Sequence, residues 1–236
     1  MDDLFGRAVQ EYWEGERRQA LVVRRDDGWA HRASPAMWFA PLWRAEAAIT
    51  GHVRGRVLDV GCGAGRHLLH FRARTLEATG LDRSEGALAV CRARGCTVLP
   101  AASVFETALP AGGFDTAVLF GNNIGMGGTP DGVRRMLRLL AEAVAPDGTV
   151  VLASQDVSLT RNRRHLDYHA ANRKAGRPIG QIRMRLEYAG ATGGWFDWLH
   201  PLPEELETLA QESGWQVALL ESLEGGGYGA VLSRAR

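Results

Sequence analysis

Apolar residues in the central part of the chain form short continuous runs that alternate with segments of helical period. The runs predict buried strands at 56–60, 77–82, 96–99, 114–120 and 149–154. The segments between them predict helices at 66–74, 84–95 and 129–144. Strands that alternate with helices in this way form a parallel sheet covered on both faces.

The C-terminal part of the chain follows a different pattern. Apolar and polar residues alternate strictly over 181–188, which predicts a half-exposed strand. A glycine-rich turn then leads into an aromatic stretch, so we expect residues 181–200 to form an antiparallel hairpin. The chain is completed by a predicted helix and two predicted strands, at 203–214, 215–222 and 228–234.

The composition narrows the class of protein. The chain has 236 residues, enough for one substantial domain with small additions. A formal net charge of +1 gives no electrostatic reason to expect nucleic acid or an acidic membrane as a partner. Lys174 is the only lysine, and such an arginine-rich composition is typical of a GC-rich bacterial genome.

The cysteines and the N-terminus indicate a compartment. Cys62, Cys91 and Cys96 are an odd number without metal-ligand spacing, so we expect free thiols in a reducing cytoplasm. The N-terminal residues do not have the pattern of a signal peptide, and no apolar run is long enough to span a membrane. A cytoplasmic location is therefore expected.

A glycine-rich turn, in the sequence VLDVGCGAG at 57–65, follows the first predicted parallel strand. Ligands of open parallel sheets bind at this edge, beyond the C-terminal ends of the strands. Gly61, Gly63 and Gly65 let the backbone approach a ligand closely and turn into the next helix. A dinucleotide-binding turn needs a glycine where Arg66 stands here, which disfavours a nicotinamide-dependent oxidoreductase.

This turn resembles the first motif of the class I S-adenosylmethionine-dependent methyltransferases, which it matches at every position. The resemblance covers about residues 56–153 and implies that Asp82, at the end of the second strand, binds both ribose hydroxyls. It also implies that Ser103 and Val104 meet the adenine, although many relatives have an aspartate at the position of Ser103. The cofactor-binding residues implied in this way are Asp59, Gly61, Cys62, Gly63, Gly65, Arg66, Asp82, Arg83, Ser103, Val104, Gly121 and Asn122.

The resemblance also implies an architecture. We expect an α/β fold with a Rossmann-like, seven-stranded, mostly parallel sheet, helices on both faces and an antiparallel seventh strand. Residues 1–55 are expected to form an N-terminal helical lid, and residues 56–236 the S-adenosylmethionine-binding domain, with an insertion at about 156–200. The cofactor would be S-adenosylmethionine, with S-adenosylhomocysteine as the product.

The acceptor of the methyl group is less constrained by the sequence. The loop after the fourth strand, FGNNIGMGG, lacks the proline and aromatic residue found in enzymes that methylate nucleic-acid bases. Asp156 has no carboxylate partner in that loop, so we expect no metal. We expect a small-molecule acceptor with an O, N or C nucleophile, in a secondary-metabolite role, and a homodimer is compatible with this interpretation. The alternatives are a non-catalytic S-adenosylmethionine-binding module, a protein or RNA methyltransferase and, with less support, an oxidoreductase.

Several residues are candidates for roles on the acceptor side, each with core packing or a solvated helix face as the simpler explanation. The candidate catalytic residues are Asn123, Asp156, Tyr168, His169, Asp197 and His200. The candidate residues of the substrate pocket are Trp13, Trp38, Trp43, Asn123, Tyr168 and Trp195.

Overall fold

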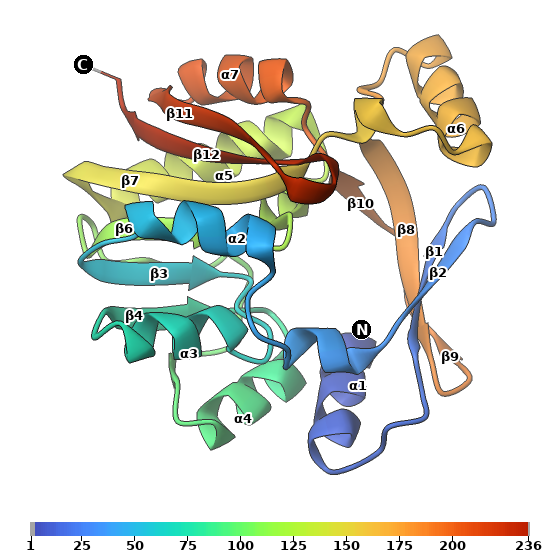
Figure 1. The fold of residues 1–236 in the computed structure, drawn as a ribbon, viewed down its shortest axis with the longest axis horizontal. Helices are drawn as coiled ribbons and strands as arrows, with labels where there is room; N and C mark the ends of the chain where they lie inside the picture. Colours follow the sequence, from blue (N-terminus) through green and yellow to red (C-terminus); the bar gives the residue numbers. More distant parts are fainter. Residues whose placement is uncertain (1–2, 236) are drawn as a thin grey trace.

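A seven-stranded sheet forms the main body of the computed structural model, which describes residues 3–235 (Figure 1). In chain order its strands are β3 (Arg56–Val60), β4 (Glu77–Leu81), β5 (Thr97–Val98), β6 (Phe114–Leu119), β7 (Val144–Gln155), β11 (Trp215–Leu223) and β12 (Gly227–Arg234). Their spatial order is β11-β12-β7-β6-β3-β4-β5, and β12 runs antiparallel to both of its neighbours. The predicted sheet, with its antiparallel last strand, is confirmed.

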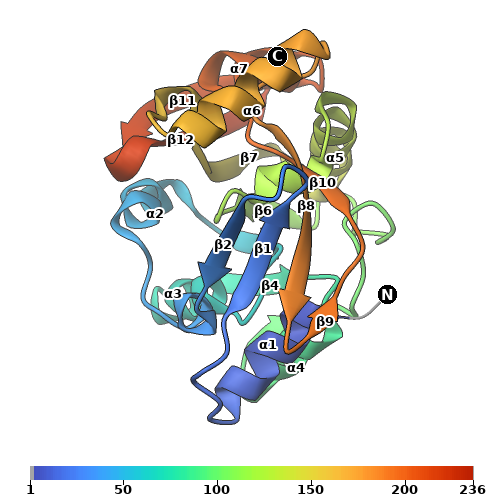
Figure 2. The same cartoon turned by 90° about the vertical axis from the view of Figure 1, so that its right-hand side faces the viewer.

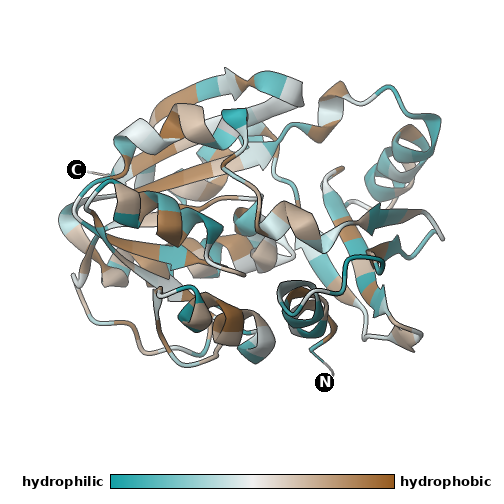
Figure 3. Cartoon of the chain, turned by 60° about the horizontal axis from the view of Figure 1, so that its bottom comes forward, coloured by the Kyte–Doolittle hydropathy of each residue, from teal (hydrophilic) through white to brown (hydrophobic). Residues whose placement is uncertain are grey.

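Helices cover both faces of this sheet. Their bounds are α2 (Arg44–Ile49), α3 (Arg66–Ala73), α4 (Glu85–Ala93), α5 (Pro130–Ala143) and α7 (Pro203–Gln211). Apolar residues of α5 and α7 form one core with the sheet, while Ile49 of α2 and Phe71 of α3 belong to a core on the other face. Figure 3 shows this distribution as hydrophobic colouring along the strands between the helices.

A second, smaller sheet joins the N-terminal part of the chain to the insertion. It contains β1 (Leu21–Arg25), β2 (Ala30–Ala33), β8 (Gln181–Tyr188), β9 (Ala191–Thr192) and β10 (Phe196–Leu199). The order is β10-β8-β1-β2, all pairs are antiparallel, and β9 pairs with β8. The antiparallel pairing of 181–188 with 196–199 agrees with the expected hairpin.

The N-terminal segment, expected to form a helical lid, contains strands as well as helices. Helix α1 (Leu4–Trp13) and helix α2 lie there, but β1 and β2 form a hairpin between them. The turn between these strands contains Asp27 and Gly28, and Gly28 has a φ of +86°, a geometry that favours glycine. β1 then pairs with β8, which lies far along the chain.

The second sheet faces the edge of the main sheet at which β3 and β4 end, as Figures 1 and 2 show from two sides. Helix α1 packs against both α4 and β8, and so bridges the two sheets at one side. Helix α6 (Arg163–Lys174) covers the opposite end of the second sheet. No helix among residues 3–235 is both long and apolar enough to cross a membrane.

Candidate functional site at the C-terminal edge of the main sheet

The glycine turn connects β3 to α3 at this edge. Gly61, Gly63 and Gly65 have φ angles of +81°, +52° and +81°, which residues with a side chain rarely adopt. The Gly61 N–H donates to the Leu81 carbonyl at 2.7 Å, which holds the turn beside the end of β4. The backbone of the turn is therefore fixed in the form that a closely approaching ligand requires.

Asp82 directly follows β4 and lies against the turn. Its Oδ2 accepts from the Gly63 N–H and its Oδ1 from the Ser84 N–H, both at 2.9 Å. Burial raises the pKa of this carboxyl group, while these backbone hydrogen bonds oppose the shift. Each carboxylate oxygen has a further lone pair, so the half-buried group is able to accept two hydroxyl donors. These features fit the ribose of S-adenosylmethionine.

Asp59, two residues before the turn, is fully buried, and neither carboxylate oxygen has a hydrogen-bond partner among the described residues. Burial raises its pKa to about 6, and the attraction of His67 opposes the shift. The His67 Nδ1 lies 3.8 Å from Oδ2. A buried carboxylate without a partner is costly, and its place below the turn fits a ligand that carries a positive charge, as S-adenosylmethionine does.

Arg66 begins α3 but points toward the N-terminal segment. Its Nη2 donates to both oxygens of Glu46 at 2.9 and 2.8 Å, and its guanidinium lies 4.4 Å from the Trp43 ring centre. Burial raises the pKa of Glu46, but His67 and Arg66 outweigh this effect and lower it. The Arg66 side chain, predicted to meet the cofactor, instead anchors α2 on α3.

The loop after β6 is tied to the glycine turn by Asn123. Its Nδ2 donates to the Val60 carbonyl at 2.8 Å and to the Gly61 carbonyl at 2.9 Å. The preceding Asn122 has a φ of +62°, and its Oδ1 accepts from the Ser154 hydroxyl. Both Nδ2 protons of Asn123 are thus used inside the fold, so this residue positions the turn and is not free to polarise an acceptor.

Two aromatic rings cover the turn. A Cβ built on Gly63 would lie 3.5 Å from Phe5 Cζ and 3.9 Å from Trp38 Cδ1. The rings of Phe5 and Trp38 meet edge to face, with centroids 5.0 Å apart. Trp38 was a predicted pocket residue, whereas Phe5 was missed. The signal for Phe5 was its position on the apolar face of α1, which also carries Leu4, Ala8 and Val9.

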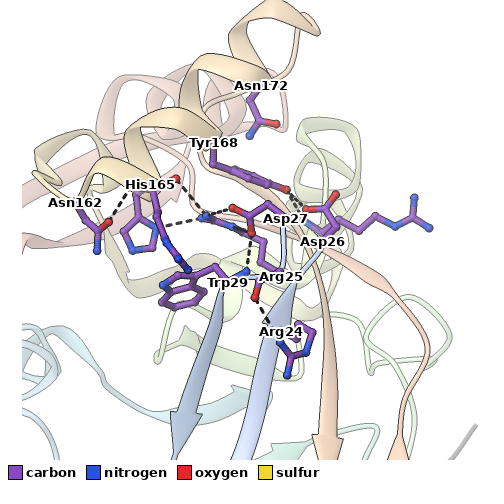
Figure 4. Close-up of polar contacts among 12 residues, drawn as sticks. Arg24, Arg25, Asp26, Asp27, Trp29, Asn162, His165, Tyr168 and Asn172 are labelled. Atoms are coloured by element: carbon purple, nitrogen blue, oxygen red, sulfur yellow. Dashed lines mark hydrogen bonds and ion pairs between the residues drawn. The ribbon is translucent and has the colours of Figure 1, made fainter.

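Tyr168 belongs to a polar cluster that joins α6 to the β1–β2 hairpin (Figure 4). Its hydroxyl donates to Asp26 at 2.8 Å and accepts from the Arg183 N–H at 3.2 Å. Burial and the bond to Asp26 raise its pKa to about 12. The Arg25 guanidinium lies 4.0 Å from the ring centre and donates to both oxygens of Asp27. These contacts give Tyr168 a role in holding α6, away from the glycine turn.

The other catalytic candidates have different surroundings. Asp156 accepts from the N–H and hydroxyl of Ser158 and caps a short helical turn. Asp197 is exposed on β10. His169 is buried, and burial together with the nearby His169 lowers the pKa of His200 to about 4, which disfavours a charged imidazole there.

The remaining aromatic candidates are partly exposed to solvent. Trp13 stacks on Phe39, Trp43 on Arg66 and Trp195 on Arg185, and each leaves more than a third of its surface exposed.

The remaining cofactor candidates divide between the turn and the core. Cys62 and Val104 have buried side chains in the apolar core, so only their backbones are available to a ligand. The loop of Ser103 is held near Asp82 because the Ala102 N–H donates to the Asp82 carbonyl at 3.1 Å. Gly121 has open space around its Cα, and Arg83 is exposed beside Asp82. Residues 3–235 contain no group of three or more His, Cys, Asp or Glu side chains suited to a metal ion.

Comparison with known proteins relates this geometry to one family. Residues 57–148 match the family model of the methyltransferase domain. No curated protein matches the sequence significantly. A solved S-adenosylmethionine-dependent methyltransferase from Bacteroides fragilis, in complex with S-adenosyl-L-homocysteine, has a TM-score of 0.85 at 22% identity, covering 99% of this chain and 95% of that chain.

Two further solved structures are similar in fold. An amino pentose methyltransferase from Micromonospora echinaspora has a TM-score of 0.56 at 20% identity and covers 85% of this chain and 94% of its own. The 1,6-didemethyltoxoflavin-N1-methyltransferase from Burkholderia thailandensis has a TM-score of 0.53 at 16% identity and covers 81% of this chain and 77% of its own. These similar structures confirm the predicted fold, and the family model identifies residues 57–148 as a methyltransferase domain.

Proposed function

We propose that this chain, which carries a class I methyltransferase domain, transfers the methyl group of S-adenosylmethionine to an O, N or C nucleophile of a small molecule. The observation that carries the proposal is the Asp82 carboxylate, held by the Gly63 and Ser84 amides beside the glycine turn. This arrangement offers acceptors for a ribose and a close approach for the methionine half of the cofactor.

The chain's own residues would bind and orient the cofactor and would exclude water from the site. Asp82 would hold the ribose, and the backbone of Gly61 and Gly63 would support the methionine half. Asn123 keeps the turn in place through its two bonds to the backbone. Phe5 and Trp38 would keep water away from that side of the turn.

Methyl transfer requires positioning more than a dedicated catalytic residue. When bound, S-adenosylmethionine supplies an electrophilic methyl group on a positively charged sulfur. The chain must hold the acceptor atom about 3–3.5 Å from that methyl group and in line with the breaking bond. The electron pair of the broken bond stays on sulfur, and an acceptor that carries a proton releases it to water or to a nearby base.

The arrangement of the added segments supports a small-molecule acceptor. Strands from residues 21–33 and 181–199 together build the second sheet, which lies across from the edge of the glycine turn. The net charge of +1 gives no attraction to nucleic acid. The similar structures include enzymes that act on an amino pentose and on 1,6-didemethyltoxoflavin. A cytoplasmic location accords with the free cysteines.

Titration calorimetry with S-adenosylhomocysteine tests the cofactor site. We expect the wild-type chain to bind it and to give no heat with NAD. The Asp82→Ala variant loses a bidentate carboxylate contact, so its affinity should fall about ten- to a hundredfold. The matched control is Glu77→Ala, at the opposite end of β4, which should bind like the wild type. Equal binding by Asp82→Ala and wild type would contradict the assignment.

A further inference from the structure

The second sheet has two chemically different faces. On the outer face, Glu187 accepts from Arg24 at 2.7 Å and from Arg185 at 2.8 Å. Alternate residues of the same strands point the other way and are apolar or aromatic, except for Arg25 at the end of β1. These half-buried inner residues are Val23, Ile182, Met184, Leu186, Phe196 and Trp198.

The inner face is turned toward the glycine turn. At one end, Tyr188 and Leu186 pack with Leu4 and Phe5 of α1, and Phe5 itself covers Gly63. At the other end, Trp198 packs so closely on Gly125, in the loop after β6, that a Cβ there would overlap its Nε1. Because the face contacts elements on both sides of the turn, its middle lies across from the turn.

The middle of this face consists of Val23, Met184 and Phe196, which the register places on neighbouring strands. All three side chains are half-buried, so part of each remains exposed to water. An apolar surface of this kind gains free energy when an apolar ligand removes it from water.

The charged or titratable side chains of the inner face are either paired with an opposite charge or lie at the edge of the sheet. Arg25, in register with Met184, is 5% exposed and donates to both oxygens of Asp27 at 2.9 and 2.6 Å. His31 lies on the edge strand β2, opposite Val23, and stacks on Trp29. An ionised acceptor would lose water here without gaining a partner, a costly exchange.

We propose that the inner face of the second sheet binds the acceptor, and that the acceptor is an uncharged molecule with an apolar ring system. The ring would lie on Val23, Met184 and Phe196, with its nucleophilic atom toward the glycine turn. This inference rests on the proposed function, because it places the ring beside the methyl group of the bound cofactor.

The test compares two probes of the same ring size on the chain saturated with S-adenosylhomocysteine. By titration calorimetry, we expect uncharged 2-naphthol to bind with a Kd below about 1 mM and anionic 2-naphthoate at least tenfold more weakly. Val23→Asp should weaken the binding of 2-naphthol at least tenfold. The control Val22→Asp places the same charge on the outer face of the same strand and should change this affinity less than twofold.

A second variant guards against misfolding. If Val23→Asp fails to bind S-adenosylhomocysteine, Met184→Gln is used in its place. This variant should bind S-adenosylhomocysteine like the wild type and bind 2-naphthol at least threefold more weakly. The acceptor class is overturned if naphthoate binds as tightly as naphthol, if naphthol does not bind, or if inner and outer variants behave alike. Loss of S-adenosylhomocysteine binding by the wild-type chain would instead refute the proposed function itself.

Discussion

Replacement of Asp59 by asparagine should stabilise the protein, and more so at high pH. Asp59 is fully buried with neither oxygen bonded among the described residues, and its pKa is raised from 3.8 to about 6. The folded state therefore holds this proton more tightly than the unfolded state. Ionisation costs stability as the pH rises from about 3.8 through 6, and the full cost applies above that range.

The magnitude follows from the two pKa values. Their difference corresponds to about 3 kcal/mol at pH 8, and to about 1.6 kcal/mol at pH 5, where most of the folded protein carries the proton. Any cost of burying the asparagine amide is independent of pH. The stability of Asp59→Asn relative to wild type should therefore rise by about 1.4 kcal/mol between pH 5 and pH 8.

Urea unfolding followed by tryptophan fluorescence measures this difference at both pH values. The control is Asp147→Asn, whose carboxylate is 84% exposed and should give the same relative stability at both. A relative stability of Asp59→Asn that stays constant or falls between pH 5 and pH 8 would refute the reasoning. It would mean that the folded protein stabilises the ionised carboxylate.

Three other predictions follow from the contacts around the turn. Asn123→Ala removes two hydrogen bonds to Val60 and Gly61, so urea unfolding should show a loss of about 1–3 kcal/mol; an unchanged midpoint would contradict the positioning role. Glu46→Ala leaves the guanidinium of Arg66 buried and unpaired, so the same measurement should show a loss of about 3–5 kcal/mol, and a loss below about 1 kcal/mol would exclude a buried ion pair. The hydrogen bond with Cys62, together with burial, raises the pKa of the Cys91 thiol. A disulfide reagent at pH 8 should therefore modify Cys91 only after unfolding in urea. Rapid labelling of Cys91 in the native protein would show that this thiol is accessible.

The main sheet was predictable because each of its central strands is a short apolar run next to a helix of clear period. The strands at 56–60 and 77–81 and the helix at 66–73 agree closely with the sequence pattern. The second sheet was only half predictable. Residues 181–188 alternate strictly, but β1 owes its stability to pairing with that distant strand, which no local pattern reveals.

The candidate site, too, could be predicted from the sequence only in part. Gly61, Gly63 and Asp82 lie together because their spacing fixes them at adjacent strand ends. The role of Arg66 was not predictable, since its partner Glu46 lies on a separate helix whose docking depends on the whole fold. Single aromatic residues such as Trp13 gave no usable signal, because ring type alone does not distinguish a pocket wall from a surface contact.

The central claim is most directly tested by transfer of tritiated methyl groups from S-adenosylmethionine into a cell lysate separated by molecular size. We predict that the wild-type chain labels the low-molecular-weight fraction and that Asp82→Ala, with the ribose contact removed, labels it at least tenfold more slowly. Label that appears only in protein or RNA would contradict the small-molecule assignment. The absence of label from every fraction, with S-adenosylhomocysteine still bound, would contradict the claim that the chain is an enzyme.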